Sequence, residues 1–186
     1  IDKIPYASLV TARFAIVVAV LSGFAAFIVA TRVPPSAWLA WFALVGPGVL
    51  SSCIDARTTF LPKVLAHISW LIAGIGVGWH ALAIRSYLPI LVSTLGVLVL
   101  GGFFWAVWKI SRGIGFGDVR LMVTIGAISG LSDPQLLATA VMAGTVLGAA
   151  WGIAHRVAGW NGPFPDGPGL LMGPFAALLI QPFLAA

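Results

Sequence analysis

The sequence has no glutamate, one cysteine and one asparagine, and charged residues make up only 8% of its 186 positions. A single cysteine, Cys53, excludes a disulfide within the chain and any multi-cysteine zinc site. The net charge of +5 comes without any cluster or stripe of Lys and Arg, so a nucleic-acid partner is not expected. The chain is instead 60% hydrophobic, which lies outside the range of soluble globular domains.

Long apolar runs divide the chain into segments that are each able to form a membrane helix, since about 20 apolar residues cross the hydrocarbon core of a bilayer. We expect an all-α, polytopic integral membrane helix bundle with six to seven transmembrane helices and a kink at Gly46-Pro47. The count stays open because the fifth and seventh segments are short. The seven candidate segments are residues 9–31, 36–54, 62–84, 88–110, 118–131, 134–157 and 169–184, and a Gly/Pro-rich loop at 159–168 precedes the last.

The basic residues predict how these segments are oriented, because cytoplasmic loops of membrane proteins are enriched in Lys and Arg. With seven alternating spans, Arg32 and Arg85 fall on one side and the other eight basic residues on the opposite side. This bias predicts a cytoplasmic N-terminus, and it places Asp55 and Asp118 at cytoplasmic ends of their spans. The eight residues are Lys3, Arg13, Arg57, Lys63, Lys109, Arg112, Arg120 and Arg156.

Asp118 follows three alternating glycines, Gly113, Gly115 and Gly117, between two apolar stretches. Ionisable groups at membrane depth are costly and usually mark a functional site. The glycines allow a sharp turn and a close approach to a substrate. A structural role is also open, since an aspartate at a helix start can cap the free N–H groups of the first turn.

Asp55 ends an earlier apolar segment, and its structural alternative is an ion pair with Arg57 or Lys63 at the membrane surface. Two aspartates on the same predicted face favour a different interpretation. Paired carboxylates that share a proton can activate water, because one takes the proton of water while the other polarises the carbonyl group. This is the chemistry of an aspartic peptidase, and it requires no metal and no cofactor.

Other polar residues carry weaker signals. His67, His80 and His155 have no metal-ligand spacing, although His67 could lie close enough to Asp55 to tune it. Asp133 and Asp166 fall in predicted loops and are interpreted as solvated charges. In the sixth span, small residues at intervals of four (Gly144, Gly148 and Gly152) predict close helix packing rather than a binding site.

Three motifs together resemble the type IV prepilin peptidases, a family of membrane aspartic proteases. Asp55-Ala-Arg-Thr-Thr-Phe-Leu-Pro62 resembles the first catalytic motif, and Gly115-Phe-Gly-Asp118-Val-Arg-Leu-Met resembles the second, with Arg120 where lysine is usual. Gly173-Pro-Phe-Ala-Ala-Leu178 resembles a segment near the C-terminus of the family. The glycine-x-glycine-aspartate element is shared with presenilin-like proteases, so the three motifs in order over about 36–184 make the match specific.

The resemblance implies that residues 1–186 form one membrane-embedded peptidase domain with Asp55 and Asp118 as the catalytic pair. It implies a substrate that is a prepilin-like precursor, cut at the cytoplasmic face just before its hydrophobic N-terminal helix. Substrate contacts are expected from Gly115, Phe116 and Gly117 and from Gly173, Pro174 and Phe175. Many bacterial members also N-methylate the product through a domain with paired cysteines, and with one cysteine we expect no methyltransferase activity here.

Two other functions remain open from the sequence. A small cation or proton-coupled transporter would use the two aspartates as ion sites, and would show ion-dependent flux without proteolysis. A structural membrane subunit would tolerate replacement of both aspartates with effects on stability alone. Membrane lipid is the only other expected partner, the expected location is a bacterial or archaeal cytoplasmic (inner) membrane, and the oligomeric state is unknown.

Overall fold

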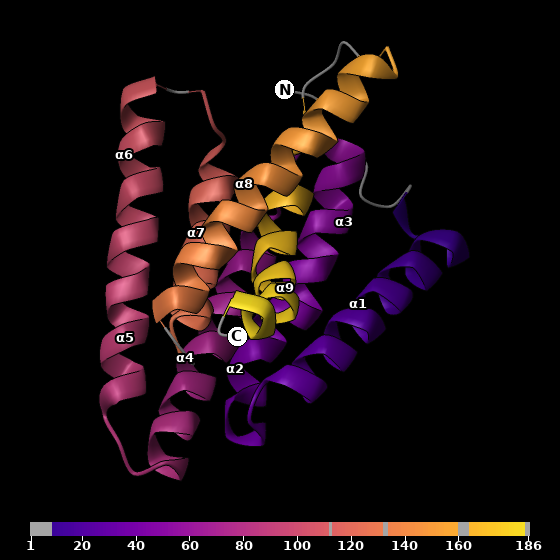
Figure 1. The fold of residues 1–186 in the computed structure, drawn as a ribbon. Coiled ribbons are helices and arrows are strands. Elements are labelled where there is room, and N and C mark those ends of the chain that lie inside the picture. The colour runs from indigo at the N-terminus through magenta and orange to yellow at the C-terminus, as the bar shows by residue number, and fades with distance from the viewer. Residues whose placement is uncertain (1–8, 112, 132–133, 160–163, 185–186) are drawn as a thin grey trace.

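The computed structural model describes residues 9–111, 113–131, 134–159 and 164–184, and every regular element in these ranges is a helix (Figure 1). Five helical segments are long and apolar enough to cross a membrane, and two shorter helices, α7 and α9, complete the bundle. The prediction of an all-α polytopic bundle is therefore confirmed. The seven segments are α1 (Ala12–Arg32), η2–α2–η3–α3 (Pro35–Thr58), α4 (Lys63–Ala83), α5–η4–α6 (Leu88–Ser111), α7 (Phe116–Ser129), α8 (Pro134–Val157) and α9 (Gly167–Leu184).

The second segment is longer than the sequence predicts, and this changes the position of Asp55. The segment continues through α3 (Val49–Thr58), so Asp55 lies in the last helical turn rather than beyond the helix. Thr59 then adopts a left-handed conformation with φ of 55°, and its N–H donates to the carbonyl of Asp55 at 2.7 Å. This is the usual geometry of a helix C-terminus, and it ends the helix at Thr58, three residues after Asp55.

The expected kink at Gly46-Pro47 takes the form of a single wide turn, η3 (Leu44–Gly48), between α2 (Trp38–Ala43) and α3. Proline has no N–H to donate, and its ring would meet the carbonyl four residues earlier in a regular α-helix. A π-turn relieves that conflict while the chain continues in the same direction. A second such turn, η4 (Val97–Gly101), joins α5 (Leu88–Gly96) to α6 (Gly102–Ser111).

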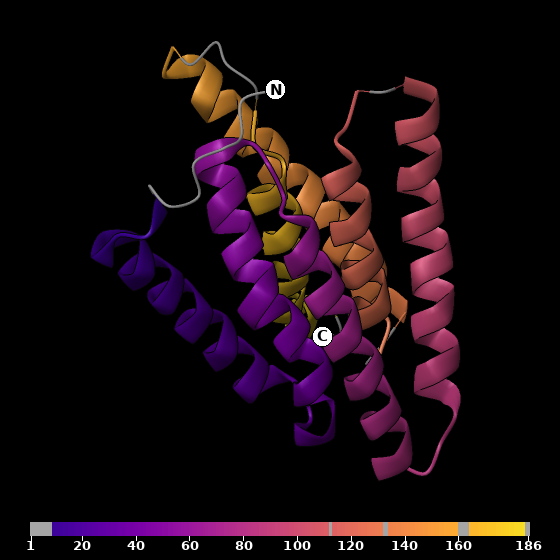
Figure 2. The same cartoon turned by 180° about the vertical axis from the view of Figure 1, so that it is seen from behind.

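Helix α7 occupies the interior of the bundle, although it has only 14 residues. Ten of these residues are buried, and the helix packs against α4, α5, η4, α6, α8 and α9 (Figures 1 and 2). The approach to α5 is close enough that the backbones of Gly96 and Gly126 are in contact, which leaves no room for a Cβ at either position. Because neighbouring helices cover most of α7 from Asp118 to Ser129, this part of the helix packs against protein rather than lipid.

Helices α8 and α9 form a closely packed antiparallel pair, as the small residues of the sixth span predict. Gly169 of α9 lies against Gly148 of α8, and Gly173 lies against Ala140 and Gly144. The backbones approach directly because none of these contacts includes a large side chain. Gly173 therefore has a structural role in fixing α9 on α8.

Helix α1 lies on the outside of the bundle and contacts it mainly through its second half. Its buried residues, Ala25, Ile28 and Val29, all fall there, whereas Ile16 and Val20 in the first half are more than 60% exposed. Figure 1 shows α1 leaning away from α3 and α9 toward its N-terminal end. The first half of α1 is thus packed less closely against the bundle than the second half.

Candidate active site

The end of α3 and the starts of α7 and α9 lie at the same end of the bundle, at the top of Figure 1. Asp55 comes from the first of these and Asp118 from the second. Two helical segments, α4 and α5–η4–α6, connect α3 to α7, so the chain crosses the bundle twice and returns to the same end. The expected placement of both aspartates at one face follows from this even number.

Asp55 is 4% exposed, and a backbone group of a distant segment holds its carboxylate. The N–H of Gly167, at the start of α9, donates to Oδ2 of Asp55 at 2.9 Å. Ser52, one turn earlier in α3, donates through Oγ to the carbonyl of Gly167 at 3.4 Å. The Asp55 carboxylate is thereby fixed between α3 and α9, and it forms neither of the ion pairs with Arg57 or Lys63 that its structural alternative requires.

Asp118 is 7% exposed and is held by its own turn. It is the third residue of α7 rather than the residue before the helix, and Gly115 occupies that preceding position. The N–H of Gly115 donates to Oδ2 of Asp118 at 3.0 Å, and the N–H of Asp118 donates to the carbonyl of Gly115 at 3.1 Å. Asp118 therefore does cap the helix, but from its third position. Its carboxylate accepts the N–H of Gly115, the residue before the helix.

Leu61 lies between the starts of α7 and α9. A Cβ placed on Gly117 would lie 2.7 Å from Cβ of Leu61, and a Cβ placed on Gly167 would lie 3.3 Å from Cδ2 of the same residue. The starts of α7 and α9 therefore converge on one side chain, and the carboxylate of Asp118 interacts electrostatically with that of Asp55. Of the three glycines before Asp118, Gly117 is the one whose missing side chain permits this approach.

Asp166 is a third carboxylate at this site, and the sequence interpretation as a solvated charge is wrong. Asp166 is half-buried, and its carboxylate interacts electrostatically with both Asp55 and Asp118. Burial also raises the pKa of Asp166 above its usual range. The sequence did contain a signal: Asp166 directly precedes the last helix, which must start at the same end of the bundle as α7. Asp133 lies outside the described residues.

Basic side chains do not neutralise this cluster. Among the described residues, none of the three carboxylates forms an ion pair with a Lys, Arg or His. Arg120, two residues after Asp118, places its guanidinium group 4.7 Å from the ring centre of Phe116 instead. No three His, Cys or Asp side chains in the described part of the chain are arranged to share one metal ion.

The remaining residues singled out from the sequence are distributed over two regions. Gly115, Phe116 and Gly117 form the start of α7 beside Asp118, whereas Gly173, Pro174 and Phe175 lie inside α9. Pro174 is fully buried and Gly173 faces α8. The ring of His67 contacts that of Trp70 at an angle of 53°, with 5.3 Å between ring centres, and His67 has no hydrogen bond to Asp55.

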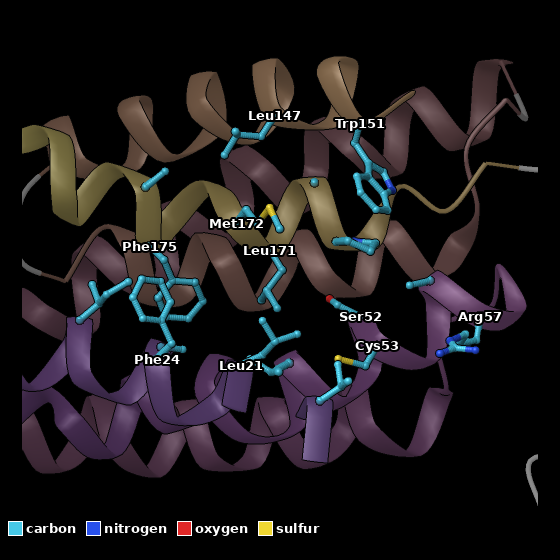
Figure 3. Close-up of a pocket in the computed structure, with 18 of the residues that line it drawn as sticks. Leu21, Phe24, Ser52, Cys53, Arg57, Leu147, Trp151, Leu171, Met172 and Phe175 are labelled. Atoms are coloured by element: carbon cyan, nitrogen blue, oxygen red, sulfur yellow. The ribbon is translucent and has the colours of Figure 1, made fainter. Parts of the chain in front are cut away.

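A cavity of about 480 Å³ lies between α1, α3, α8 and α9 (Figure 3). Its walls are almost entirely apolar, and Phe24 and Phe175 lie at one end. At the other end lie Ser52, Cys53 and Arg57, next to Asp55 in α3. Pro168, which follows Gly167, also lines the cavity, so the lining residues at this end adjoin Asp55 and Gly167 in the chain, although neither of these two residues lines the cavity itself.

The fold and the site together define a polytopic helical membrane protein with a cluster of buried carboxylates at one end of its bundle. Comparison with known proteins shows that this chain is similar to two proteins named as prepilin peptidases. It is 32% identical over 177 residues to proteins named prepilin leader peptidase/N-methyltransferase from Burkholderia pseudomallei strains 1026b and K96243. The similarity covers 90% of this chain and 54% of each relative, so the chain spans about half the length of the curated relatives that it matches.

The comparison confirms the resemblance inferred from the three motifs. No family model matches the chain, and no solved structure matches it either. The assignment of individual residues therefore depends on the motifs and on the geometry of the site.

Proposed function

We propose that this protein is a membrane-embedded aspartic endopeptidase that removes the leader peptide from type IV pilin-like or Tad/Flp-like precursors. The observation that carries the proposal is the pair of buried aspartates, Asp55 and Asp118, which come from different helices and have no basic partner among the described residues. The name of the relatives, prepilin leader peptidase, supports the same activity. The Asp55 and Asp118 carboxylates are the proposed catalytic groups.

The proposed reaction needs one proton shared by the two carboxylates. The ionised carboxylate takes a proton from water, and the resulting hydroxide attacks the carbonyl carbon of the scissile peptide bond. The protonated carboxylic acid donates its proton to the carbonyl oxygen, which gives a neutral tetrahedral intermediate. The intermediate then collapses: the aspartate that took the proton of water gives it to the nitrogen, the C–N bond breaks, and one hydroxyl of the intermediate returns its proton to the other aspartate. A carboxylic acid and an amine leave as products, and the pair again holds one shared proton.

Backbone donors prepare the two side chains for this reaction. Gly167 and Gly115 each bind one oxygen, Oδ2, of Asp55 and Asp118 respectively. A carboxylate fixed through one oxygen keeps the other available for water or for the substrate carbonyl group. Preorganised groups of this kind avoid reorganisation during the reaction, which is a large part of enzymatic rate acceleration.

The apolar cavity is the proposed docking site for the hydrophobic N-terminal helix of the precursor. Its position argues for this occupant, because the cavity runs along α3 and α9 and is lined by Ala56 and Pro168, the residues that follow Asp55 and Gly167 in the chain. A helix seated there would present the peptide bond that precedes it to the two aspartates. Of the three residues proposed from the C-terminal motif, only Phe175 lines this cavity. Gly173 packs against α8, and Pro174 is fully buried.

The proposed location is the cytoplasmic membrane of a bacterium or an archaeon, with the N-terminus and the aspartates on the cytoplasmic side. The described basic residues support this orientation: Arg13, Arg57, Lys63, Lys109, Arg120 and Arg156 belong to helix ends on the side of the aspartates. Arg32 and Arg85 belong to the opposite side. The expected lack of methyltransferase activity stays a prediction, which incubation of the cleaved product with a methyl donor tests.

Cleavage by the purified protein tests the proposal. The protein in detergent or lipid nanodiscs is incubated with a prepilin-like precursor, and the N-terminus of the product is sequenced. A double variant, Asp55→Asn with Asp118→Asn, detects contaminating peptidases. A new N-terminus just before the hydrophobic helix, seen with wild type alone, supports the proposal. Ion flux through reconstituted vesicles without cleavage of several precursors would replace it with the transporter alternative.

A further inference from the structure

The segment that leads into α9 lies directly against Asp55, although 112 positions separate Gly167 from Asp55 in the sequence. Gly167 makes two hydrogen bonds to α3, as donor to Asp55 and as acceptor from Ser52. The segment on both sides of it is packed as well, since Pro165 and Gly169 are buried. Hydrogen bonds and packing therefore hold this part of the chain in place beside Asp55.

Gly167 is close to Asp55 because it has no side chain. A Cβ at this position would lie 2.8 Å from Oδ2 and 3.3 Å from Cγ of Asp55. The atom that it would meet is the end of a side chain rather than the backbone. A methyl group at position 167 would therefore displace the carboxylate while leaving the path of α9 intact.

Asp166 occupies the position where an aspartate commonly caps a helix, but it does not act as a cap. Its carbonyl accepts from the N–H of Leu170 at 3.1 Å, which places it just before α9. Among the described residues, no N–H of the first turn donates to its carboxylate. The half-buried carboxylate instead interacts electrostatically with those of Asp55 and Asp118.

We propose that Asp166 and Gly167 are positioning residues of the peptidase reaction. The N–H of Gly167 holds the carboxylate of Asp55 in the position that the reaction needs. Asp166 supplies a negative charge that helps the aspartate pair to retain its shared proton. The inference rests on the proposed function, and it adds a third chain segment, the start of α9, to the two catalytic motifs. No resemblance to a motif assigns either residue this role.

Gly167→Ala tests the first part. The methyl group moves the carboxylate of Asp55, and a misplacement of about 1 Å can cost roughly 100-fold in rate. We expect kcat for precursor cleavage to fall about 100-fold while KM and the unfolding temperature stay near wild type. Gly74→Ala is the matched control, since a Cβ at Gly74 meets no atom within 4 Å. Wild-type kcat in Gly167→Ala, or a loss of activity that parallels unfolding, would overturn this part.

Asp166→Asn tests the second part through the pH dependence of cleavage. The titratable groups that interact with Asp166 are Asp55 on α3 and Asp118 on α7; the described cations at this end form no ion pair with it. Removing the charge lets the pair lose its shared proton more easily. The alkaline limb of the rate profile should therefore move to lower pH, by on the order of one unit.

Asp166→Glu keeps the charge and should restore the wild-type profile, which a purely structural role of the side chain would not predict. An unchanged profile in Asp166→Asn, beside active wild type and inactive Asp55→Asn, would overturn the role of Asp166 and leave the proposed function intact. If wild type itself fails to cleave any precursor, the proposed function fails and this inference fails with it.

Discussion

Replacing Gly117 by alanine is expected to lower the rate of cleavage, because the added methyl group would collide with Leu61 next to Asp118. A Cβ there would lie 2.7 Å from Cβ of Leu61, whereas ordinary van der Waals contact begins at 3.4 Å. The start of α7 and Leu61 must then separate by 3.4 − 2.7 = 0.7 Å. Asp118 is the next residue, so this shift is transmitted to its carboxylate.

Two effects of Gly117→Ala follow from that shift. Overpacking of a filled interior costs about 1–3 kcal/mol, which lowers the unfolding temperature without preventing folding. Misplacement of the Asp118 carboxylate by a large part of an ångström lowers kcat by up to about 100-fold. We therefore expect a larger loss of activity than the loss of folded protein explains.

The assay compares kcat for a labelled precursor with thermal unfolding in the same detergent. Gly102→Ala serves as the control, because a Cβ at Gly102 meets no atom within 4 Å. Leu61 contacts the positions beside both aspartates, so it is the residue through which the effect should act. If folded Gly117→Ala cleaves the precursor within about twofold of wild type, the argued packing between α7 and Leu61 is wrong.

Three further predictions concern packing, substrate binding and the link between α3 and α9. Gly96→Ala should destabilise the protein by about 1–3 kcal/mol in detergent unfolding, because a Cβ would meet the backbone of Gly126; wild-type stability would contradict the α5–α7 contact. Phe24→Ala should raise KM several-fold at constant kcat, since Phe24 lines the cavity; an unchanged KM would argue against the cavity as docking site. Ser52→Ala should cost about 1 kcal/mol or less and lower kcat a few-fold, because its bond to Gly167 is long at 3.4 Å. A kcat at wild-type level would show that this bond does not support Asp55.

The membrane helices could be predicted because the apolar runs and their Pro and Gly boundaries report directly on burial in lipid. The segments at 88–110 and 134–157 match α5–η4–α6 and α8 within one residue at each end. The second segment was predicted too short, since Asp55 and Arg57 are polar and the hydropathy pattern ends before the helix does. The left-handed conformation of Thr59, which ends α3, leaves no signal in hydropathy.

The two aspartates could be proposed from the sequence because few carboxylates exist in the chain and both adjoin apolar segments. The two residues proposed to position them, Gly167 and Asp166, could not be predicted from the sequence. Gly167 acts through its backbone N–H, and Asp166 acts through proximity created by the α8–α9 pair. Neither contribution depends on a side-chain pattern near Asp55, since the contact joins residues 112 positions apart. The interior position of α7 was also not predicted, because a short span and a buried helix have similar sequences.

The most direct measurement is the single-turnover cleavage rate of a prepilin-like precursor by Asp55→Asn and by Asp118→Asn, each reconstituted in lipid. Asparagine keeps the size of the side chain and removes its acid–base function, which contributes roughly 10²- to 10⁴-fold for each group. We predict that each variant keeps the unfolding temperature of wild type and loses at least about 100-fold in rate. Cleavage by either folded variant within about tenfold of wild type would contradict the central claim that Asp55 and Asp118 together activate water.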